Sequence, residues 1–276
     1  MPELPEVETY VRQLRPQLLG RTFTAAEVIW PRTVAAPEVE DLRTRLVGQK
    51  IEEVGRRGKY LRFSLSSGDH LLIHLKMSGR LRVEESDCPR QPHDRVAFAL
   101  DNGQELRFND MRKFGRVYLV ETGHGVTAAL GPEPLDDKFT LEEFAARLRK
   151  RPAIIKSLLL NQSFLAGVGN IYADEALYRA RIHPLRKANR LHDDEIEALY
   201  RAIREVLQRS IECQGTHFDF VYTGGVREST ATYQSYLQVY QRTGESCPRC
   251  GHAIERIVVG GRGTHFCPEC QRRCQS

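Results

Sequence analysis

Residues 247–270 read CPRCGHAIERIVVGGRGTHFCPEC and contain two Cys-x-x-Cys pairs separated by sixteen residues. Each pair, Cys247 with Cys250 and Cys267 with Cys270, brings two thiolates close enough to share one metal ion. Two such pairs complete a closed tetrahedral set, which is typical of structural rather than catalytic zinc. A module this small buries little apolar surface, so we expect zinc to supply most of its folding free energy. The spacing predicts a zinc ribbon, and the alternatives are a redox pair or chance clustering.

The segment between the cysteine pairs has the pattern of a β-hairpin. Residues 254–259 suit a strand, and Gly260-Gly261-Arg262-Gly263 follows with Arg262 at the expected tip. Flanking glycines let the backbone approach a ligand closely, and a guanidinium can form two parallel hydrogen bonds to a phosphate. Arg262 is therefore a candidate phosphate ligand, although a lone arginine in a turn usually faces solvent.

The composition is that of an ordinary globular protein. The 276 residues include 41% hydrophobic and 28% charged residues, with a formal net charge of +5, which permits a polyanionic partner without requiring one. No run of about 18 apolar residues predicts a transmembrane helix, and the acidic, proline-rich start is unlike a signal peptide. The remaining cysteines, Cys88, Cys213 and Cys274, show no pairing pattern. We therefore expect a cytoplasmic protein without membrane association.

The first half of the chain changes from a helical to a strand pattern. Pro5 suits a first helical turn, apolar residues follow at helical spacing to Leu18, and Gly20 suits the end. Short strand-like stretches then follow, with a hairpin signal at 101–103. Such strands with regular turns indicate an antiparallel β-sandwich. The predicted strands are residues 22–30, 60–65, 71–76, 95–100 and 105–108.

The second half of the chain has helical periodicity. Thr140 with Glu143 suits a capping box, and helical runs are expected at 154–165, 172–180 and 193–213. The turn Gly167-Val168-Gly169-Asn170 would expose backbone amides to an anion such as a DNA phosphate, unless it is a plain helix connector. We predict an α+β fold with four segments. These are a β-sandwich domain (2–130), a linker (131–150), a helical domain (151–239) and the zinc ribbon (240–276).

The first residues contain a candidate nucleophile. If Met1 is removed, Pro2 carries a free secondary amine, and an α-amino group with a pKa near 7.7–8.0 is partly neutral at physiological pH. A neutral amine can attack an electrophilic sugar carbon and form an iminium. Glu3 is a candidate acid–base group beside it, and Glu6 could support it. Taken alone, such a start is usually a frayed tail.

Seven stretches, in order along the chain, resemble one family, the formamidopyrimidine-DNA glycosylases, within the wider group that includes endonuclease VIII. The chain start and the zinc-ribbon pattern are the most specific. Residues 169–172, with a complete ribbon, resemble the bacterial formamidopyrimidine branch. The matching stretches are residues 2–8, 56–60, 74–79, 112–115, 130–134, 165–173 and 261–270.

The resemblance implies roles for four catalytic residues. Pro2 would attack C1′ of the damaged nucleotide and form a Schiff base, with Glu3 acting as acid and base. Lys59 would bind the phosphate near the lesion and assist elimination. Arg262 would hold the same stretch of backbone and take part in the second elimination.

The resemblance also implies seven DNA contacts. Met77, Arg112 and Phe114 match residues that enter the space left by an extruded base. Base flipping costs a few kcal/mol, an apolar wedge restores some stacking, and an arginine can bond the orphaned partner base. By residue type alone, Met77 and Phe114 would be assigned to the core and a lone histidine to a structural role. The remaining implied contacts are His74, His93, Arg151 and Asn170.

One departure concerns the loop over the flipped base. The family usually has Gly-Gly-Thr-Thr-Leu followed by Lys or Arg, whereas residues 213–219 here read CQGTHFD. Phe218 therefore stands where a cation is expected. Because phenylalanine offers a stacking face but no charge, the preference for 8-oxoguanine stays open.

We expect a monomeric, bifunctional DNA glycosylase/AP lyase of base-excision repair, with one structural Zn²⁺ as its cofactor. Its partner would be double-stranded DNA containing oxidised bases or abasic sites. It would remove oxidised purines, chiefly formamidopyrimidines and 8-oxoguanine, and nick the strand by β,δ-elimination. One alternative is an endonuclease VIII-like glycosylase for oxidised pyrimidines, and the other is a non-catalytic damaged-DNA-binding module.

Overall fold

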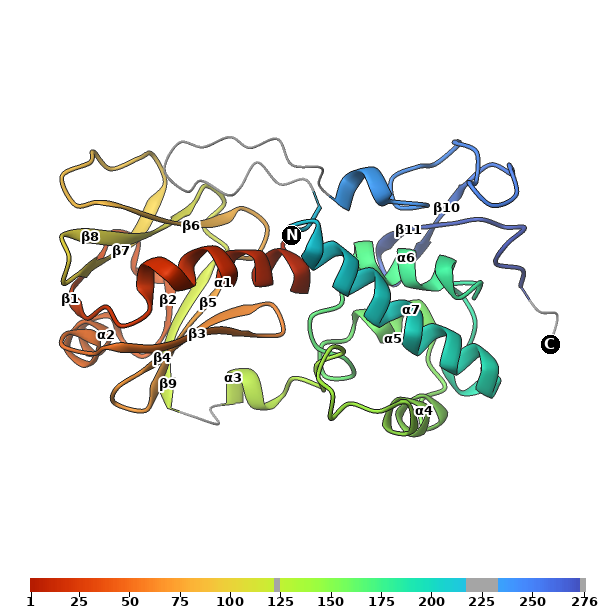
Figure 1. Ribbon diagram of the computed structural model, residues 1–276, viewed down its shortest axis with the longest axis horizontal. Helices are drawn as coiled ribbons and strands as arrows, with labels where there is room; N and C mark the ends of the chain where they lie inside the picture. The colour runs from red at the N-terminus through yellow and green to blue at the C-terminus, as the bar shows by residue number, and fades with distance from the viewer. Residues whose placement is uncertain (122–124, 217–232, 274–276) are drawn as a thin grey trace. The chain divides into compact units, whose positions relative to one another are not determined.

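This computed structural model describes residues 1–121, 125–216 and 233–273 of the chain (Figure 1). The described residues divide into two compact units, one ending at Ala128 and one beginning at Ala129. The expectations for Phe218 and Cys274 lie outside the described residues. The limits of the four predicted segments remain predictions.

The first unit opens with helix α1 (Leu4–Leu18), as the apolar spacing predicts. Its buried side chains, among them Val7 and Val11, join the core of the β-sandwich. The helix ends just before Gly20, which has a φ of +81°. The backbone N–H of Glu3 donates to the Glu6 carboxylate at 2.9 Å, so the start of the chain is held in place and not frayed.

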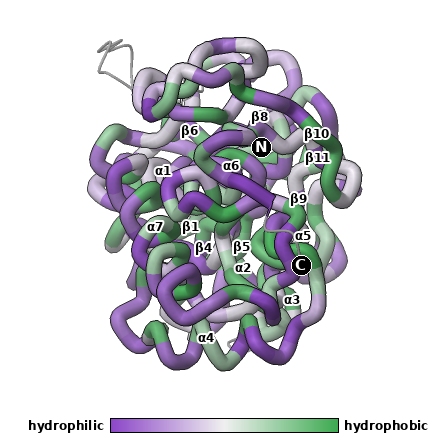
Figure 2. The backbone as a smooth tube through the Cα atoms, turned by 90° about the vertical axis from the view of Figure 1, so that its right-hand side faces the viewer, coloured by the Kyte–Doolittle hydropathy of each residue, from purple (hydrophilic) through white to green (hydrophobic). Residues whose placement is uncertain are grey.

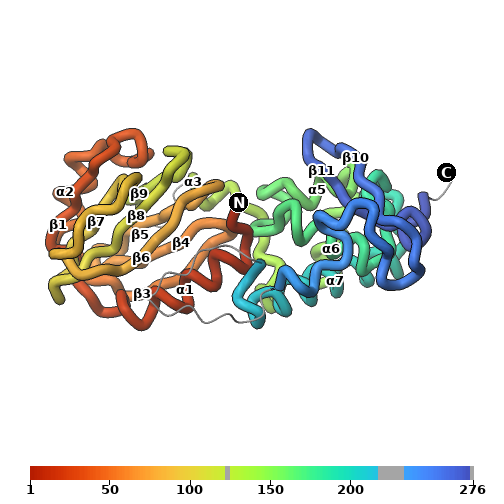
Figure 3. The backbone as a smooth tube through the Cα atoms, turned by 90° about the horizontal axis from the view of Figure 1, so that it is seen from above, coloured from red at the N-terminus to blue at the C-terminus, as the bar shows by residue number. Residues whose placement is uncertain are grey.

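Two sheets form the sandwich (Figure 3), with strand orders β1-β7-β8-β6 and β2-β9-β5-β4-β3. All neighbouring strands are antiparallel except β2 and β9, which are parallel. Alternate residues of β4, such as Leu61 and Phe63, point into the core, and Figure 2 shows how hydrophobic and hydrophilic segments alternate along the chain. The predicted 101–103 turn joins β7 to β8. The strands are β1 (Phe23–Val28), β2 (Val34–Ala36), β3 (Ile51–Arg57), β4 (Tyr60–Leu65), β5 (Asp69–His74), β6 (Gly79–Glu85), β7 (Asp94–Leu100), β8 (Gln104–Asp110) and β9 (Arg116–Glu121), with helices α2 (Val39–Leu46) and α3 (Gly125–Ala128).

The second unit is mainly helical. The Thr140 hydroxyl accepts the Glu143 N–H at 3.3 Å and caps α4. The run predicted as a helix over 154–165 ends early, at Leu160. The Asn161 side chain accepts the Ser163 N–H at 2.9 Å, a local bond that competes with helix continuation. The helices of the second unit are α4 (Leu141–Arg149), α5 (Ile155–Leu160), α6 (Asn170–Arg179) and α7 (Asp193–Glu212), with the short 3-10 helices η2 (Ala188–Arg190) and η3 (Tyr233–Tyr236). The first unit contains a further short 3-10 helix, η1 (Pro31–Thr33).

The predicted hairpin of the zinc module is present and packs against α6. Strands β10 (Glu255–Val259) and β11 (Arg262–Phe266) are antiparallel, with Val259 opposite Arg262. Gly260 and Gly261, at φ values of +56° and +75°, form the two-residue turn, a conformation that suits glycine. Arg262 is thus the first residue after the tip, and not the tip itself.

Candidate active site

The predicted nucleophile lies at an ordered chain start. Pro2 is buried, Glu3 is 3% exposed and Met1 is 41% exposed. Glu3 directly precedes α1, and its carbonyl accepts the Val7 N–H at 3.1 Å. Removal of Met1 would therefore leave the Pro2 nitrogen as a chain end one residue before the ordered N-terminus of α1.

Lys59 occupies the two-residue turn between β3 and β4. Gly58 supplies the positive φ of +57° that this turn needs, and Lys59 is only 6% exposed. The next residue, Tyr60, lies opposite His74 on β5, and the two rings meet edge to face at 4.7 Å. The turn therefore brings Lys59 close to His74.

His74 is a neutral histidine in basic surroundings. Burial, followed by the positive charges of Lys76 and Lys59, lowers the pKa of His74 to about 3. The Lys76 backbone N–H donates to Nδ1 of His74 at 3.0 Å, which leaves the proton on Nε2. His74 can therefore donate from Nε2 to an anion but carries no charge at neutral pH.

Three further predicted contacts gather at the surface of the first unit. Met77 and Phe114 are 52% and 48% exposed, so the alternative that both belong to the core is wrong. The Arg112 guanidinium donates to the Met77 sulfur at 3.3 Å, and its central carbon lies 4.9 Å from the Phe114 ring centre. The structure thus assembles an exposed group with two apolar side chains around one cation, which we call the wedge group (Met77, Arg112, Phe114).

His93 lies in an exposed turn before β7, with a φ of +76°. Its carbonyl accepts the Asp110 N–H at 3.0 Å, and its ring lies 3.2 Å from the Arg95 guanidinium. His93 is therefore attached to the end of β8, from which the loop with Arg112 departs.

In the second unit, the glycine-rich loop and the zinc hairpin meet. The Asn170 side chain donates to the Gly263 carbonyl at 2.8 Å, which places the first residue of α6 beside the residue that follows Arg262. Arg262 is exposed. The structure therefore brings Asn170 and Arg262 together, whereas Arg151 is exposed just after α4.

A buried hydrogen-bond network lies beneath the contact between Asn170 and the zinc hairpin, and the sequence did not predict it. Lys156 on α5 donates to the Asp174 carboxylate on α6 at 2.5 Å and to the Asn170 carbonyl at 3.0 Å. The other Asp174 oxygen accepts the His265 backbone N–H at 3.0 Å and lies 3.1 Å from Nδ1 of the His265 ring. A lysine inside the apolar run 154–160 is the signal that could have revealed the network.

The four predicted zinc ligands lie together. Their sulfur atoms are all within 4.8 Å of one another, with 3.8 Å between Cys247 and Cys270 and 3.5 Å between Cys250 and Cys267. Four sulfurs at about 2.3 Å from zinc are about 3.8 Å apart, so the residues fit a structural zinc ion. Backbone N–H groups and a tyrosine hydroxyl lie 3.3–3.4 Å from these sulfurs and would stabilise thiolates. Cys88 and Cys213 are outside this group.

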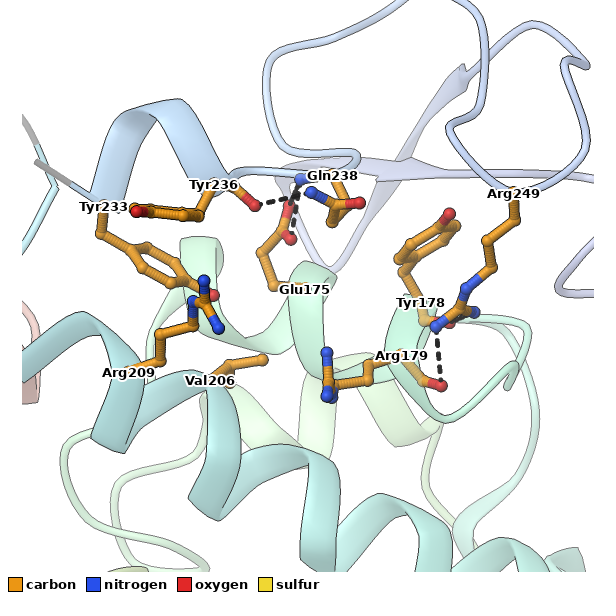
Figure 4. A pocket seen from close by; sticks show the side chains of 9 residues that line it. All are labelled: Glu175, Tyr178, Arg179, Val206, Arg209, Tyr233, Tyr236, Gln238 and Arg249. Carbon is orange, nitrogen blue, oxygen red and sulfur yellow. Dashed lines mark hydrogen bonds between the residues drawn. The ribbon is translucent and has the colours of Figure 1, made fainter. Parts of the chain in front are cut away.

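A pocket of about 260 Å³ in the second unit contains none of the predicted site residues (Figure 4). Its arginines already have partners. Arg249 donates to the carbonyls of Tyr178 and Arg179, Arg179 pairs with Glu205, and Arg209 lies 4.5 Å from the Tyr236 ring centre. The lining residues are Glu175, Tyr178, Arg179, Val206, Arg209, Tyr233, Tyr236, Gln238 and Arg249.

Among the helices that the structure describes, none combines the length and the apolar character of a membrane-spanning segment. The first unit is a β-sandwich with a buried proline near the start of the chain, and the second is helical with a glycine-rich loop and a four-cysteine hairpin. These features agree with the class of protein expected from the sequence, a zinc-containing DNA-repair enzyme. Comparison with known proteins agrees with this class and narrows it. Family models match residues 1–117 as the formamidopyrimidine-DNA glycosylase N-terminal domain, 130–221 as its H2TH domain, and 244–275 as the zinc finger found in FPG and IleRS.

Similar proteins cover 99% of the chain. A formamidopyrimidine-DNA glycosylase of Protochlamydia amoebophila is 44% identical over 99% of this chain and 100% of its own length. A solved structure of a Lactococcus lactis FPG mutant with Fapy-dG-containing DNA is 40% identical, with a TM-score of 0.89 over 99% and 100% of the two chains. MutM with carbocyclic 8-oxo-G-containing DNA is also 40% identical, with a TM-score of 0.88 over the same shares. The chain therefore belongs to the formamidopyrimidine-DNA glycosylase family. The predicted family, α+β fold, enzyme class and structural zinc are confirmed.

Proposed function

We propose that this chain is a bifunctional DNA glycosylase/AP lyase that removes formamidopyrimidines and 8-oxoguanine from double-stranded DNA. Relatives of 40% identity have been solved with DNA containing Fapy-dG or 8-oxo-G. The observation that carries the proposal is the ordered start of the chain, in which Pro2 and Glu3 are consecutive buried residues directly before α1.

The first part of the reaction is base loss through a covalent intermediate. The Pro2 nitrogen attacks C1′, and the C1′–N bond breaks with its electron pair leaving on the base, which takes up a proton. The attacking nitrogen loses its proton and the C1′–O4′ bond opens, which gives an iminium between Pro2 and C1′. Glu3 supplies the proton to O4′ and later accepts protons as a base.

The second part is strand cleavage. Loss of a proton from C2′ expels the 3′-phosphate, and loss of a proton from C4′ then expels the 5′-phosphate. Cationic and amide donors stabilise the phosphates as they leave. Lys59 and Arg262 supply the charge, and Asn170, fixed beside Gly263, helps to hold the backbone.

The remaining residues hold the opened DNA. The wedge group fills the space left by the extruded base, where Met77 and Phe114 restore stacking and Arg112 bonds the unpaired partner. His74 donates to a phosphate from Nε2 without carrying charge, while His93 and Arg151 contact the backbone. Zinc stabilises the ribbon and takes no part in the chemistry. The enzyme acts as a monomer in the cytoplasm, where the thiolates stay reduced.

Borohydride trapping on an 8-oxoguanine duplex tests the nucleophile. The natural protein should become covalently linked to DNA, whereas a form that retains Met1, in which the Pro2 nitrogen is an amide, should not. Pro2→Gly keeps a primary amine and should trap weakly. Equal trapping by the Met1 form would refute the assignment. Excision from a thymine-glycol duplex, run in parallel, distinguishes a preference for oxidised purines from one for oxidised pyrimidines.

A further inference from the structure

The end of β8 contains a buried carboxylate that joins two surface loops. Asp110 is 1% exposed. One of its oxygens accepts the Ser78 hydroxyl at 2.5 Å and the Arg112 backbone N–H at 3.2 Å. The other oxygen accepts the Gly115 N–H at 2.7 Å. A single side chain thus connects the loop that carries Met77 with the loop that carries Arg112 and Phe114.

The backbone of the same residue holds a third segment. The Asp110 N–H donates to the His93 carbonyl at 3.0 Å, and the Arg95 guanidinium donates to the Asp110 carbonyl at 2.8 Å. The segment that carries His93 is therefore held at the same point as the other two. All predicted DNA contacts of the first unit except the buried His74 lie on segments attached to Asp110.

Close packing leaves these loops little freedom to rearrange. A Cβ added to Gly115 would lie 2.3 Å from the ring of the core residue Phe108, and one added to Gly79 would lie 2.9 Å from the same ring. Both loops therefore lie against the core with no side chain between. Exposed apolar side chains such as Met77 and Phe114 would reduce their contact with water by collapsing onto the surface, unless the loops that carry them are fixed.

We propose that Asp110 is a positioning residue that fixes the wedge group before DNA binds. Its carboxylate holds both loops in the arrangement that lets Met77, Arg112 and Phe114 enter the DNA as soon as a base is extruded. The proposal rests on the proposed function of the wedge group. It requires Asp110 to matter for lesions paired in a duplex, where a base must leave the stack. It requires no effect on an abasic site in single-stranded DNA, where no base is extruded.

The protein contains a built-in reporter of this arrangement. Trp30 is the only tryptophan of the chain, and the Lys113 ammonium lies 3.9 Å from its ring centre. Lys113 sits between Arg112 and Phe114, with a φ of +59°, so its place above the indole depends on the loop conformation. Trp30 emission therefore reports the position of the loop without any reaction.

The experiment compares Asp110→Asn with two other variants. Glu105→Gln is the matched control, because Glu105 is a buried carboxylate on the same strand that bonds to Arg107 and Arg90, and neither arginine lies in the two loops that carry the wedge group. Ser78→Ala removes the hydroxyl that donates to Asp110 and accepts the Arg112 backbone N–H at 3.3 Å, and it serves if Asp110→Asn folds poorly. Single-turnover excision from an 8-oxoguanine duplex is measured beside cleavage of an abasic single strand, together with Trp30 emission.

We expect Asp110→Asn to lower duplex excision on the order of 10- to 100-fold, as for loss of a hydrogen bond to a buried charged group. Ser78→Ala should lower it less. Cleavage of the abasic single strand should stay within about threefold, and Trp30 emission should shift in Asp110→Asn but not in Glu105→Gln. An unchanged ratio of the two activities, or a parallel loss of both, would overturn the proposal. If the natural protein cleaves neither substrate, the proposed function fails instead, while Trp30 emission still tests the loop anchor.

Discussion

Replacement of Asp174 by asparagine tests the buried network beneath Asn170 and Arg262. The Asp174 and Lys156 side chains are both fully buried and joined at 2.5 Å. Asparagine keeps the shape of the side chain and one acceptor for the His265 N–H, but it removes the negative charge. The Lys156 ammonium then stays in the interior without its counter-ion.

The expected loss of stability is large. Breaking a buried ion pair from one side costs about 3–5 kcal/mol, compared with a total stability of about 5–15 kcal/mol for a typical domain. The second variant Lys156→Met, added to Asp174→Asn, removes the isolated charge and should restore at least about 2 kcal/mol. Weaker attachment of β11 to α6 should also lower affinity for duplex DNA with an abasic analogue about tenfold, which corresponds to about 1.4 kcal/mol.

Urea unfolding measures the first effect, and fluorescence anisotropy with labelled duplex measures the second under conditions where every variant is folded. Glu175→Gln is the control. Glu175 is buried on the same helix but accepts backbone N–H groups from residues 238–240, so its loss should reduce stability without changing DNA affinity. A cost below about 1 kcal/mol for Asp174→Asn, or no recovery in the double variant, would refute the reasoning.

Three further predictions concern pH, metal and charge. The folded-state pKa of His74 is near 3, below its unfolded value of about 6.5. Between these two pH values the imidazole is protonated in the unfolded chain but not in the folded protein. The stability of the fold therefore falls as pH drops below about 6.5. From pH 7 to 5 the free energy of unfolding should fall by about 2 kcal/mol through His74. His74→Phe should lose correspondingly less stability over this range in urea unfolding. Equal losses in both proteins would contradict the lowered pKa of His74. Chelation of zinc, or Cys250→Ser, should unfold the ribbon and abolish duplex binding while the far-UV signal of the β-sandwich persists; binding that survives complete zinc removal would disprove the structural role. Arg262→Ala should reduce the dependence of log affinity on log salt by about one phosphate contact, and an unchanged slope would exclude a phosphate contact at this residue.

The sequence predicted best what depends on local chemistry. The two Cys-x-x-Cys pairs predicted the metal site because the two thiolates of each pair lie within four residues of one another in the sequence. Helix α1 followed from apolar spacing, and the 101–103 turn predicted the β7–β8 hairpin that the structure contains. Each of these features is decided by neighbours in the chain.

Features that depend on distant partners could not be predicted in the same way. Asp110 and Asp174 have ordinary sequence surroundings, and their importance appears only through Ser78 and His265, which are 32 and 91 residues away. Met77 and Phe114 look like core residues because both are apolar. Their exposure is set by the conformation of the loops that carry them, which residue type does not reveal. The early end of the 154–165 helix came from a side-chain bond of Asn161 that competes with the helical pattern.

The exposed Met1 and the buried Pro2 have a consequence for how the enzyme matures. Under the proposed mechanism the protein forms no iminium until Met1 is removed and the Pro2 nitrogen becomes a free amine. The peptide bond to be cut joins the exposed Met1 to the buried Pro2. Removal of Met1 is therefore easiest on the nascent chain, before α1 packs against the sandwich. Under the same mechanism, a molecule that folds before Met1 is removed would have an amide at the Pro2 nitrogen and could not attack C1′.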